Sequence, residues 1–211
     1  GYVCPEPRAE LYREIDAANV DLKAFTESFY EKVTGSHLKN VLETLVYLKH
    51  ETNVWLEITT LLIPGQNDSD GELEELTRWI AANLGRDVPL HFTAFHPDWK
   101  MLDLERTPLA TLTRARAIGR ANGLRYVYTG NVDDEAGAST PCAGCGTIVI
   151  RRRGYEILAF LLDRKGRCLR CGAACPGVFE ANPGTWGSRR QVVRGLEWAE
   201  PADKLRITSS V

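Results

Sequence analysis

The chain has 211 residues, of which 44% are hydrophobic and 26% are charged, and its formal net charge is −2. This composition supports a hydrophobic core and excludes an intrinsically disordered chain. No apolar run approaches the ~20 residues that a membrane-spanning helix needs, and no signal peptide opens the chain. We therefore expect a cytoplasmic protein without a membrane partner, built as one medium-sized domain or as a domain with a small module.

Charge and cysteine content change together late in the chain. Residues 1–139 carry 14 Lys and Arg against 22 Asp and Glu, whereas residues 140–211 carry 12 against 6. Cys4 lies near the start, and the other five cysteines lie in the second part. The polar stretch 133–139 between the two parts is predicted to be a linker. The predicted division is a first domain over 1–132, a cysteine-rich module over 133–180 and an extended tail over 181–211.

Up to position 132, helical and strand patterns alternate. Helical patterns cover 5–15, 38–48, 69–85 and 107–122, and strand patterns cover 17–22, 54–63, 90–96 and 124–128. Ser69 to Glu72 has the form of a capping box, in which two side chains bond each other's backbone amides. The alternation predicts an α/β fold with parallel strands, and the nearly continuous hydrophobicity of 54–63 predicts a strand covered on both faces.

Polar side chains lie at or near the carboxyl ends of these strands, where parallel α/β folds bind ligands. They are Asp21, Lys23, Glu57, Thr59, His96 and Asn131. Asp21 and Lys23 share one face, and so do Glu57 and Thr59. Plainer interpretations also exist: Asp21 and Lys23 as a surface ion pair, Glu57 as a core carboxylate satisfied by a neighbouring lysine, and His96 as a structural histidine. Their convergence at one end of a sheet favours a ligand site without naming the ligand.

Several motifs occur in the order found in one enzyme family. They are Val20-Asp21-Leu22-Lys23, Phe29-Tyr30 with Val33-Thr34-Gly35, Leu62 to Asp68, and Phe92 to Pro97. From about residue 1 to 180, the chain resembles the later half of a radical S-adenosylmethionine (SAM) enzyme of the pyruvate formate-lyase-activating-enzyme-like branch. Within that branch, the enzymes of the AmmeMemoRadiSam system also carry a C-terminal double CxxC segment.

The resemblance implies a partial or full TIM-type (βα) barrel. It also implies a 4Fe–4S cluster, held by a CxxxCxxC motif, that reductively cleaves SAM to a 5′-deoxyadenosyl radical for hydrogen abstraction. By resemblance, Asp21 and Lys23 lie where activating enzymes contact the amino-acid moiety of SAM, and His96 matches their SAM-contacting histidine. Glu57 and Thr59 occupy a strand on which those enzymes carry an arginine, and they are further candidates for SAM contact. A glycyl-radical-activase-like enzyme acting on a protein substrate is the function that this branch suggests.

The motif that would hold the radical-generating cluster does not occur in this sequence. Cys4 has no cysteine at cluster spacing and is interpreted as an incidental thiol. We therefore expect this chain to be the C-terminal part of such an enzyme, inactive alone and lacking roughly the first half of the barrel. No residue is assigned a catalytic role.

Two CxxCG motifs predict a metal site in the module. Cys142, Cys145, Cys168 and Cys171 have the spacing of a four-cysteine zinc ribbon, and the residues between them contain two strand patterns, 147–151 and 155–158. Zinc is the expected metal. An auxiliary iron–sulfur cluster is an alternative because Cys175-Pro176 extends a ferredoxin-like ligand run, and disulfides do not suit a cytoplasmic protein. Cys175 is then a spare thiol or an alternate ligand.

The module is rich in arginine and lysine, and this composition is the basis of an alternative to the enzyme function. The basic residues are Arg151, Arg152, Arg153, Arg164, Lys165, Arg167, Arg170, Arg189, Arg190 and Arg194. The alternative is a non-catalytic zinc-ribbon module whose basic face contacts nucleic acid or protein. A solvated face, or docking on the acidic first domain, explains the same pattern without a nucleic-acid partner, and we favour that explanation.

Overall fold

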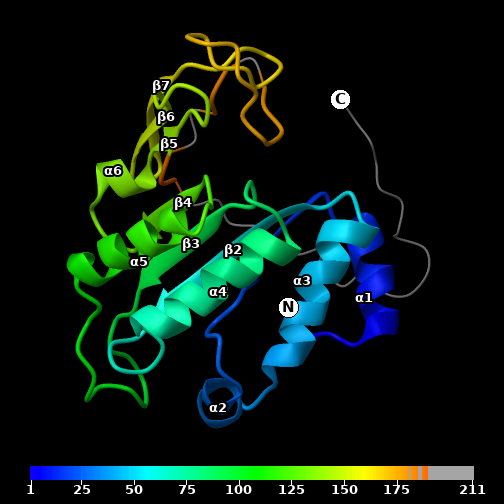
Figure 1. Ribbon diagram of the computed structural model, residues 1–211, viewed down its shortest axis with the longest axis vertical. Helices are drawn as coiled ribbons and strands as arrows, with labels where there is room; N and C mark the ends of the chain where they lie inside the picture. The colour runs from blue at the N-terminus through cyan, green and yellow to red at the C-terminus, as the bar shows by residue number, and fades with distance from the viewer. Residues whose placement is uncertain (181, 185–186, 190–211) are drawn as a thin grey trace, which may run out of the picture.

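The computed structural model describes residues 1–180, 182–184 and 187–189. Its main sheet has four parallel strands in the order β1-β2-β3-β4. They are β1 (Ala17–Asp21), β2 (Trp55–Leu62), β3 (Leu90–Ala94) and β4 (Val127–Gly130), of which β2, β3 and β4 are labelled in Figure 1. The predicted α/β class with parallel strands is confirmed. A closed barrel is not formed by the described residues, because β1 and β4 are the two ends of an open sheet.

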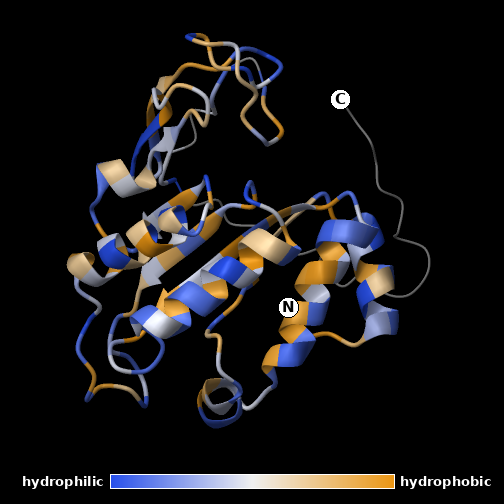
Figure 2. Cartoon of the chain, in the orientation of Figure 1, coloured by the Kyte–Doolittle hydropathy of each residue, from blue (hydrophilic) through white to orange (hydrophobic). Residues whose placement is uncertain are grey.

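The helices between the strands follow the predicted order. They are α1 (Pro5–Leu11), η1 (Tyr12–Glu14), α2 (Glu27–Phe29), η2 (Tyr30–Thr34), α3 (Leu38–Glu51), α4 (Asp70–Asn83) and α5 (Leu109–Ala121). The α2 helix and the π-helical turn η2 were not predicted. Helices α3, α4 and α5 cover one face of the sheet (Figure 1) and bury their apolar sides there, while their polar sides remain blue in Figure 2.

The two faces of the sheet differ in burial. In β2, every second side chain, such as Ile58 and Leu62, is fully buried against the helices. The residues between them, including Glu57 and Thr59, are only partly covered. Within the described residues, the helices cover one face of β2, as predicted, whereas the other face is only partly covered. The other face, called here the open face, carries the polar side chains.

Two boundaries differ from the predictions. Strand β4 begins at Val127, later than predicted, because Arg125 donates its backbone N–H to the Arg86 carbonyl outside the sheet, and pairing with β3 starts only with the bond from the Leu90 amide to the Tyr126 carbonyl. The predicted linker instead contains a short helix, α6 (Glu135–Ala138), which Asp134 caps by accepting from the Gly137 amide at 3.0 Å.

The cysteine-rich module has its own antiparallel sheet in the order β5-β6-β7. Its strands are β5 (Thr140–Pro141), β6 (Ile148–Arg153) and β7 (Glu156–Phe160), and the two strand patterns predicted here are confirmed. A second, small core gathers around Val149, Ile150 and Leu162. The extended tail predicted for 181–211 falls largely outside the described residues, as do Arg190 and Arg194. In the described part of the chain, no helix has the length and apolarity required to cross a membrane.

Candidate functional site

Asp21 and Lys23 form an ion pair at the carboxyl end of β1. The Lys23 Nζ lies 3.0 Å from Asp21 Oδ1, and both side chains are partly exposed. The backbone of Lys23 is fixed from two sides: its N–H donates to the Tyr30 hydroxyl at 3.0 Å, and its carbonyl accepts from Asn67 Nδ2 at 2.6 Å. Burial raises the pKa of Tyr30 to about 12, so its hydroxyl stays protonated at neutral pH. The pair is thus presented on a rigid backbone rather than on a loose loop.

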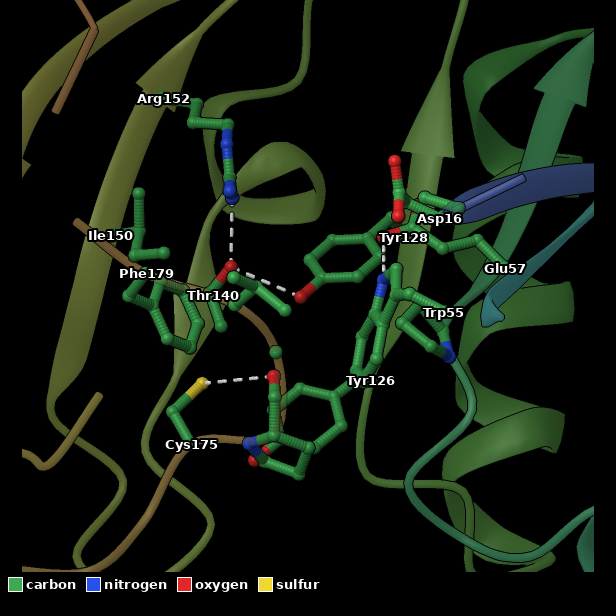
Figure 3. Close-up of a pocket in the computed structure, with 15 residues that line it drawn as sticks. Asp16, Trp55, Glu57, Tyr126, Tyr128, Thr140, Ile150, Arg152, Cys175 and Phe179 are labelled. Carbon is green, nitrogen blue, oxygen red and sulfur yellow. Dashed lines mark hydrogen bonds between the residues drawn. The ribbon is translucent and has the colours of Figure 1, made fainter. Parts of the chain in front are cut away.

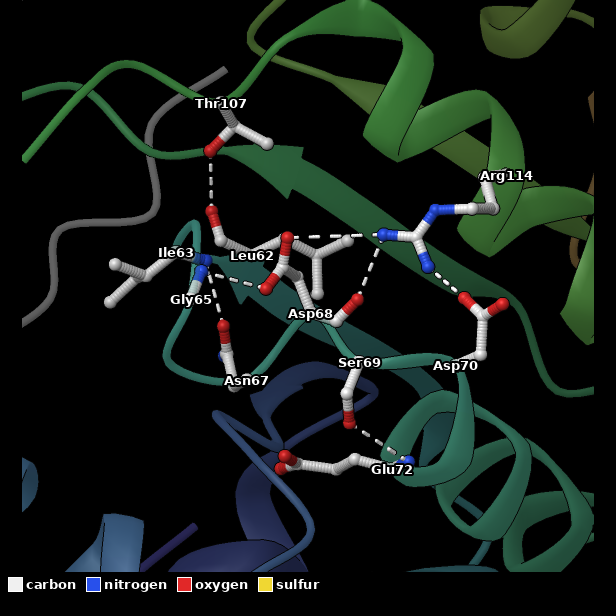
Figure 4. Close-up of polar contacts among 10 residues, drawn as sticks. All are labelled: Leu62, Ile63, Gly65, Asn67, Asp68, Ser69, Asp70, Glu72, Thr107 and Arg114. Carbon is white, nitrogen blue, oxygen red and sulfur yellow. Dashed lines mark hydrogen bonds and ion pairs between the residues drawn. The ribbon is translucent and has the colours of Figure 1, made fainter.

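The loop after β2 provides part of this rigidity (Figure 4). Asn67 is 2% exposed, and it also donates to the Leu61 carbonyl and accepts from the Ile63 amide. Asp68 accepts from the Gly65 amide at 2.8 Å, and Arg114 of α5 donates to the Asp68 carbonyl and pairs with Asp70. The residues that carry the family resemblance here therefore tie the ends of β1 and β2 together.

The capping-box prediction is half correct. Ser69 accepts from the Glu72 amide at 3.3 Å, as expected. The Glu72 carboxylate does not return to Ser69 but accepts from the Phe25 amide at 2.6 Å. Burial raises the pKa of Glu72. The side chain is used to hold the segment after Lys23 in place, which a local sequence pattern could not reveal.

His96 lies two residues beyond the end of β3 and is exposed. The preceding residue, Phe95, is fixed by Thr107, whose hydroxyl accepts from the Phe95 amide at 2.9 Å and donates to the Leu62 carbonyl. Within the described residues, no hydrogen bond or ion pair joins His96 to Asp21 or Lys23. All three belong to the carboxyl end of the sheet, and their contact with SAM stays a prediction.

Glu57 and Thr59 lie on the open face rather than at the strand's carboxyl end. Thr59 donates to Asn19 Oδ1 at 2.8 Å. Glu57 is the third residue of β2, and its two carboxylate oxygens bond His91 Nε2 at 2.8 Å and Trp55 Nε1 at 3.0 Å. The interpretation of Glu57 as a carboxylate with a partner is confirmed, although the partner is His91 rather than a lysine.

Sequence reasoning missed the residues that surround Glu57. His91 stacks on Tyr128 with ring centroids 5.0 Å apart, and the Tyr128 hydroxyl lies 3.0 Å from Thr140 Oγ1. Arg152 of the module donates to the same Thr140 oxygen at 2.7 Å. This network joins the open face to the module. The alternation of polar residues in β3 could have indicated His91, but no local signal indicated Tyr128, or that Arg152, noted only as one of the basic residues, lies next to the sheet.

The Glu57–His91 pair predicts a pH-dependent stability. The hydrogen bond from His91 is the main cause that lowers the pKa of Glu57 below its usual 4.5, and it outweighs burial. A lowered pKa in the folded state stabilises the protein above the unfolded pKa, and this stabilisation is lost as pH falls. In urea unfolding, wild type should therefore exceed Glu57→Gln in stability above about pH 4.5, with the difference shrinking below that pH. A difference independent of pH, or one that persists in a His91→Gln background, would contradict the assignment.

The four predicted metal ligands converge in the module. The ligand atoms of Cys142, Cys145, Cys168 and Cys171 all lie within 4.8 Å of one another. The Sγ atoms of Cys142 and Cys171 are 3.5 Å apart, and those of Cys145 and Cys168 are 3.9 Å apart. The glycine after each second cysteine turns the backbone with a positive φ, 74° at Gly146 and 75° at Gly172. The four cysteines thus form a possible metal site.

The two remaining cysteines lie outside this cluster. Cys4 is exposed at the start of α1, and it is not part of any metal-binding group found among the described residues. Cys175 is partly buried, and burial raises the pKa of its thiol. Its Sγ donates to the Pro176 carbonyl at 3.9 Å instead of joining the four-cysteine cluster.

The described basic residues of the module are mostly engaged within the chain. Arg151 pairs with Glu135 at 2.7 Å, and Arg153 lies 3.6 Å from Glu156. Arg170 donates to the Thr147 hydroxyl at 2.9 Å. These contacts reduce the positive charge or donor capacity of the three arginines, and the absence of a nucleic-acid partner stays a prediction.

A groove of about 750 Å³ runs along the open face beside β4. Among the residues that line it are Glu57, His91, Arg106, Tyr128, Asn131 and Arg152. Asn131 has a positive φ of 59° and donates to the Ala94 carbonyl, so it joins the ends of β3 and β4. Asn131 thus lies at the carboxyl end, as its sequence position suggested.

Two proteins of Methanocaldococcus jannaschii are similar in sequence to this chain. No protein-family model matches the chain. The chain is 39% identical over 173 residues to the uncharacterized protein MJ0808 of Methanocaldococcus jannaschii. The matched stretch covers 82% of this chain and 51% of that protein. It is also 29% identical over 108 residues to a putative glycyl-radical enzyme activating enzyme of the same organism. That matched stretch covers 50% of this chain and 41% of that protein. The chain thus spans about half the length, or less, of these relatives.

The fold has a counterpart among solved structures. A domain of a pyruvate-formate lyase-activating enzyme from Bacteroides vulgatus superposes with a TM-score of 0.53 at 16% sequence identity. The match covers 61% of this chain and 75% of that one. At this identity, the likeness shows that the two share a fold.

Proposed function

We propose that this chain supplies the SAM-contacting part of a radical SAM enzyme of the activating-enzyme type, with a protein as substrate. The observation that carries the proposal is the Asp21–Lys23 ion pair, held by Tyr30 and Asn67 at the carboxyl end of a parallel strand. The similarity to a putative glycyl-radical enzyme activating enzyme and the fold shared with an activating-enzyme domain support it.

The chemistry of the strand-end residues suits SAM. The Lys23 ammonium complements the SAM carboxylate, and the Asp21 carboxylate complements its ammonium group. The exposed His96 offers a ring nitrogen at the same end of the sheet. SAM bound there supplies a carbon–sulfur bond that can be cleaved reductively. The groove on the open face, next to the Glu57–His91 pair, is the proposed place for the substrate segment.

The radical-generating cluster does not fit the cysteines of this chain. Cys4 is isolated, and the four-cysteine cluster lies in the module rather than at the carboxyl end of the sheet. We therefore expect the reading frame upstream of Gly1 to encode a CxxxCxxC motif, which DNA sequencing would check. A start codon just before Gly1, preceded by a stop codon, would overturn the proposal.

Substitutions at the strand ends test the SAM site in the protein encoded by the complete reading frame. Lys23→Ala and His96→Ala should each weaken SAM binding by about tenfold in calorimetric titration, the usual effect of losing one charge-assisted hydrogen bond. Lys49→Ala, at an exposed lysine of α3, is the matched control and should bind SAM like wild type. Equal affinity for SAM in all three variants would contradict the assignment.

We further propose that the module binds one zinc ion. Zn–S bonds of about 2.3 Å in a tetrahedron place the sulfur atoms about 3.8 Å apart. The separations of 3.5 and 3.9 Å fit that spacing. An iron–sulfur cube holds each thiolate on a different iron atom, so its sulfur ligands lie further apart than ligands around one ion. The spacing therefore favours a single ion over the iron–sulfur alternative.

A further inference from the structure

A second cavity, of about 370 Å³, lies between the amino ends of the strands and the module (Figure 3). Trp55, Tyr126 and Tyr128 line it from the sheet, and Ile150, Arg152 and Phe179 line it from the module. Strands β2 and β4 begin here, so the cavity is at the opposite end of the sheet from Asp21, Lys23 and His96. Its volume falls within the range of small-molecule sites, about 300–1,000 Å³.

The Tyr126 hydroxyl in this cavity has no hydrogen-bond partner among the described residues, although the side chain is buried. Only 3% of Tyr126 is exposed. A buried hydroxyl without a partner is costly, and native proteins satisfy nearly all such groups. Burial raises the pKa of Tyr126, and so does an interaction with the Cys175 thiol, which is only a weak hydrogen-bonding group and leaves the hydroxyl without a strong acceptor. A bound ligand with an acceptor atom would satisfy it.

Arg152 presents a positive charge to the same cavity. Its neighbours Arg151 and Arg153 are both ion-paired, whereas Arg152 has no carboxylate within 4.0 Å in the described part of the chain. One nitrogen, Nη1, is held by Thr140 and by the Ala138 carbonyl, and this orients the guanidinium. A guanidinium held in this way is well suited to a carboxylate.

Two acidic side chains, Asp16 and Glu57, line the cavity, and neither forms an ion pair with Arg152 in the described part of the chain. Both carboxylate oxygens of Glu57 are occupied, by His91 and by Trp55. Aromatic side chains, among them Trp55 and Phe179, form part of the wall together with smaller residues and the exposed Asp16, and they offer surfaces on which a flat molecule could pack. The cavity thus combines aromatic surfaces, one available cation and one unpaired hydroxyl donor.

We propose that this cavity binds a small aromatic carboxylate, with its carboxylate on Arg152 and a second acceptor atom on the Tyr126 hydroxyl. The site is independent of the proposed SAM site, because the two lie at opposite ends of the sheet. Its failure would leave the proposed SAM site unchanged, and the converse also holds, although Glu57, Tyr128 and Arg152 also line the groove proposed for the substrate segment.

The test uses para-hydroxybenzoate and its neutral counterpart para-hydroxybenzamide, titrated into the full chain by calorimetry or ligand-observed NMR. We expect the carboxylate to bind at least about tenfold more tightly than the amide, as one charge-assisted hydrogen bond implies. Arg152→Gln should abolish this preference, whereas Arg153→Gln, on the same strand, should retain it. Tyr126→Phe, which removes only the unpaired hydroxyl, should weaken binding of both probes severalfold and leave their ratio unchanged.

Three outcomes would overturn the proposal. They are no binding of either probe at millimolar concentration, equal binding of the two probes by wild type, and a preference that survives in a folded Arg152→Gln variant. Because Arg152 also holds Thr140, the circular dichroism and metal content of Arg152→Gln are compared with those of wild type. If that variant is unfolded, Tyr126→Phe and the probe pair decide alone, and unchanged affinities in Tyr126→Phe would reject the site.

Discussion

Replacing Cys145 with serine should remove the metal from the module. Cys145 contributes one of the four sulfur atoms that lie within 4.8 Å of one another, and serine is a poor ligand for zinc. The binding free energy of structural zinc is about 10–16 kcal/mol in small zinc-binding peptides, and it is largely folding free energy. We expect the metal content after treatment with a mild chelator to fall from about one ion per chain to nearly none. Elemental analysis measures this directly.

The same variant should loosen the module while leaving the main sheet intact. The module's core is small, and two of its buried members, Cys142 and Cys168, are themselves metal ligands. Hydrogen exchange over residues 140–175 should therefore increase strongly, while exchange in β2 and β3 should change little.

Cys175→Ser is the matched control for this experiment. Cys175 lies near the cluster in sequence but does not belong to it, so this variant should retain its metal and its exchange protection. Unchanged metal content in Cys145→Ser would contradict the four-cysteine site. Loss of metal in Cys175→Ser would show instead that Cys175 is a ligand.

Replacing Asn67 with alanine should destabilise the first domain by about 3 kcal/mol, because three buried or partly buried backbone groups lose their partner. These groups are the carbonyls of Lys23 and Leu61 and the amide of Ile63. Each such loss costs about 1–3 kcal/mol when water cannot replace the partner. Urea unfolding followed by tryptophan fluorescence measures the change in free energy.

Asn67→Asp separates hydrogen bonding from packing, because it keeps the shape of the side chain but removes both N–H donors. We expect it to destabilise at least as much as Asn67→Ala, since a carboxylate would then face two carbonyl oxygens. Asn53→Ala, at an exposed asparagine before β2, is the control and should change stability by less than about 0.5 kcal/mol. A similarly small effect at Asn67 would show that the loop does not tie β1 to β2.

The sequence by itself determined the features that depend on local pattern. Helical periodicity predicted α3, α4 and α5, and alternation with strands predicted a parallel sheet, because these signals arise within a few neighbouring residues. The paired CxxCG motifs predicted the four-cysteine cluster for the same reason, since each motif forms its own turn.

The tertiary structure alone decided which side chains meet. Glu57 pairs with His91 because β2 and β3 are neighbours in the sheet, and the Glu72 carboxylate leaves its capping box for Phe25 because α4 packs near the end of β1. The cavity with Tyr126 and Arg152 exists only where the module meets the sheet. Such contacts depend on register and packing between segments far apart in the chain, and no local pattern of residues encodes them.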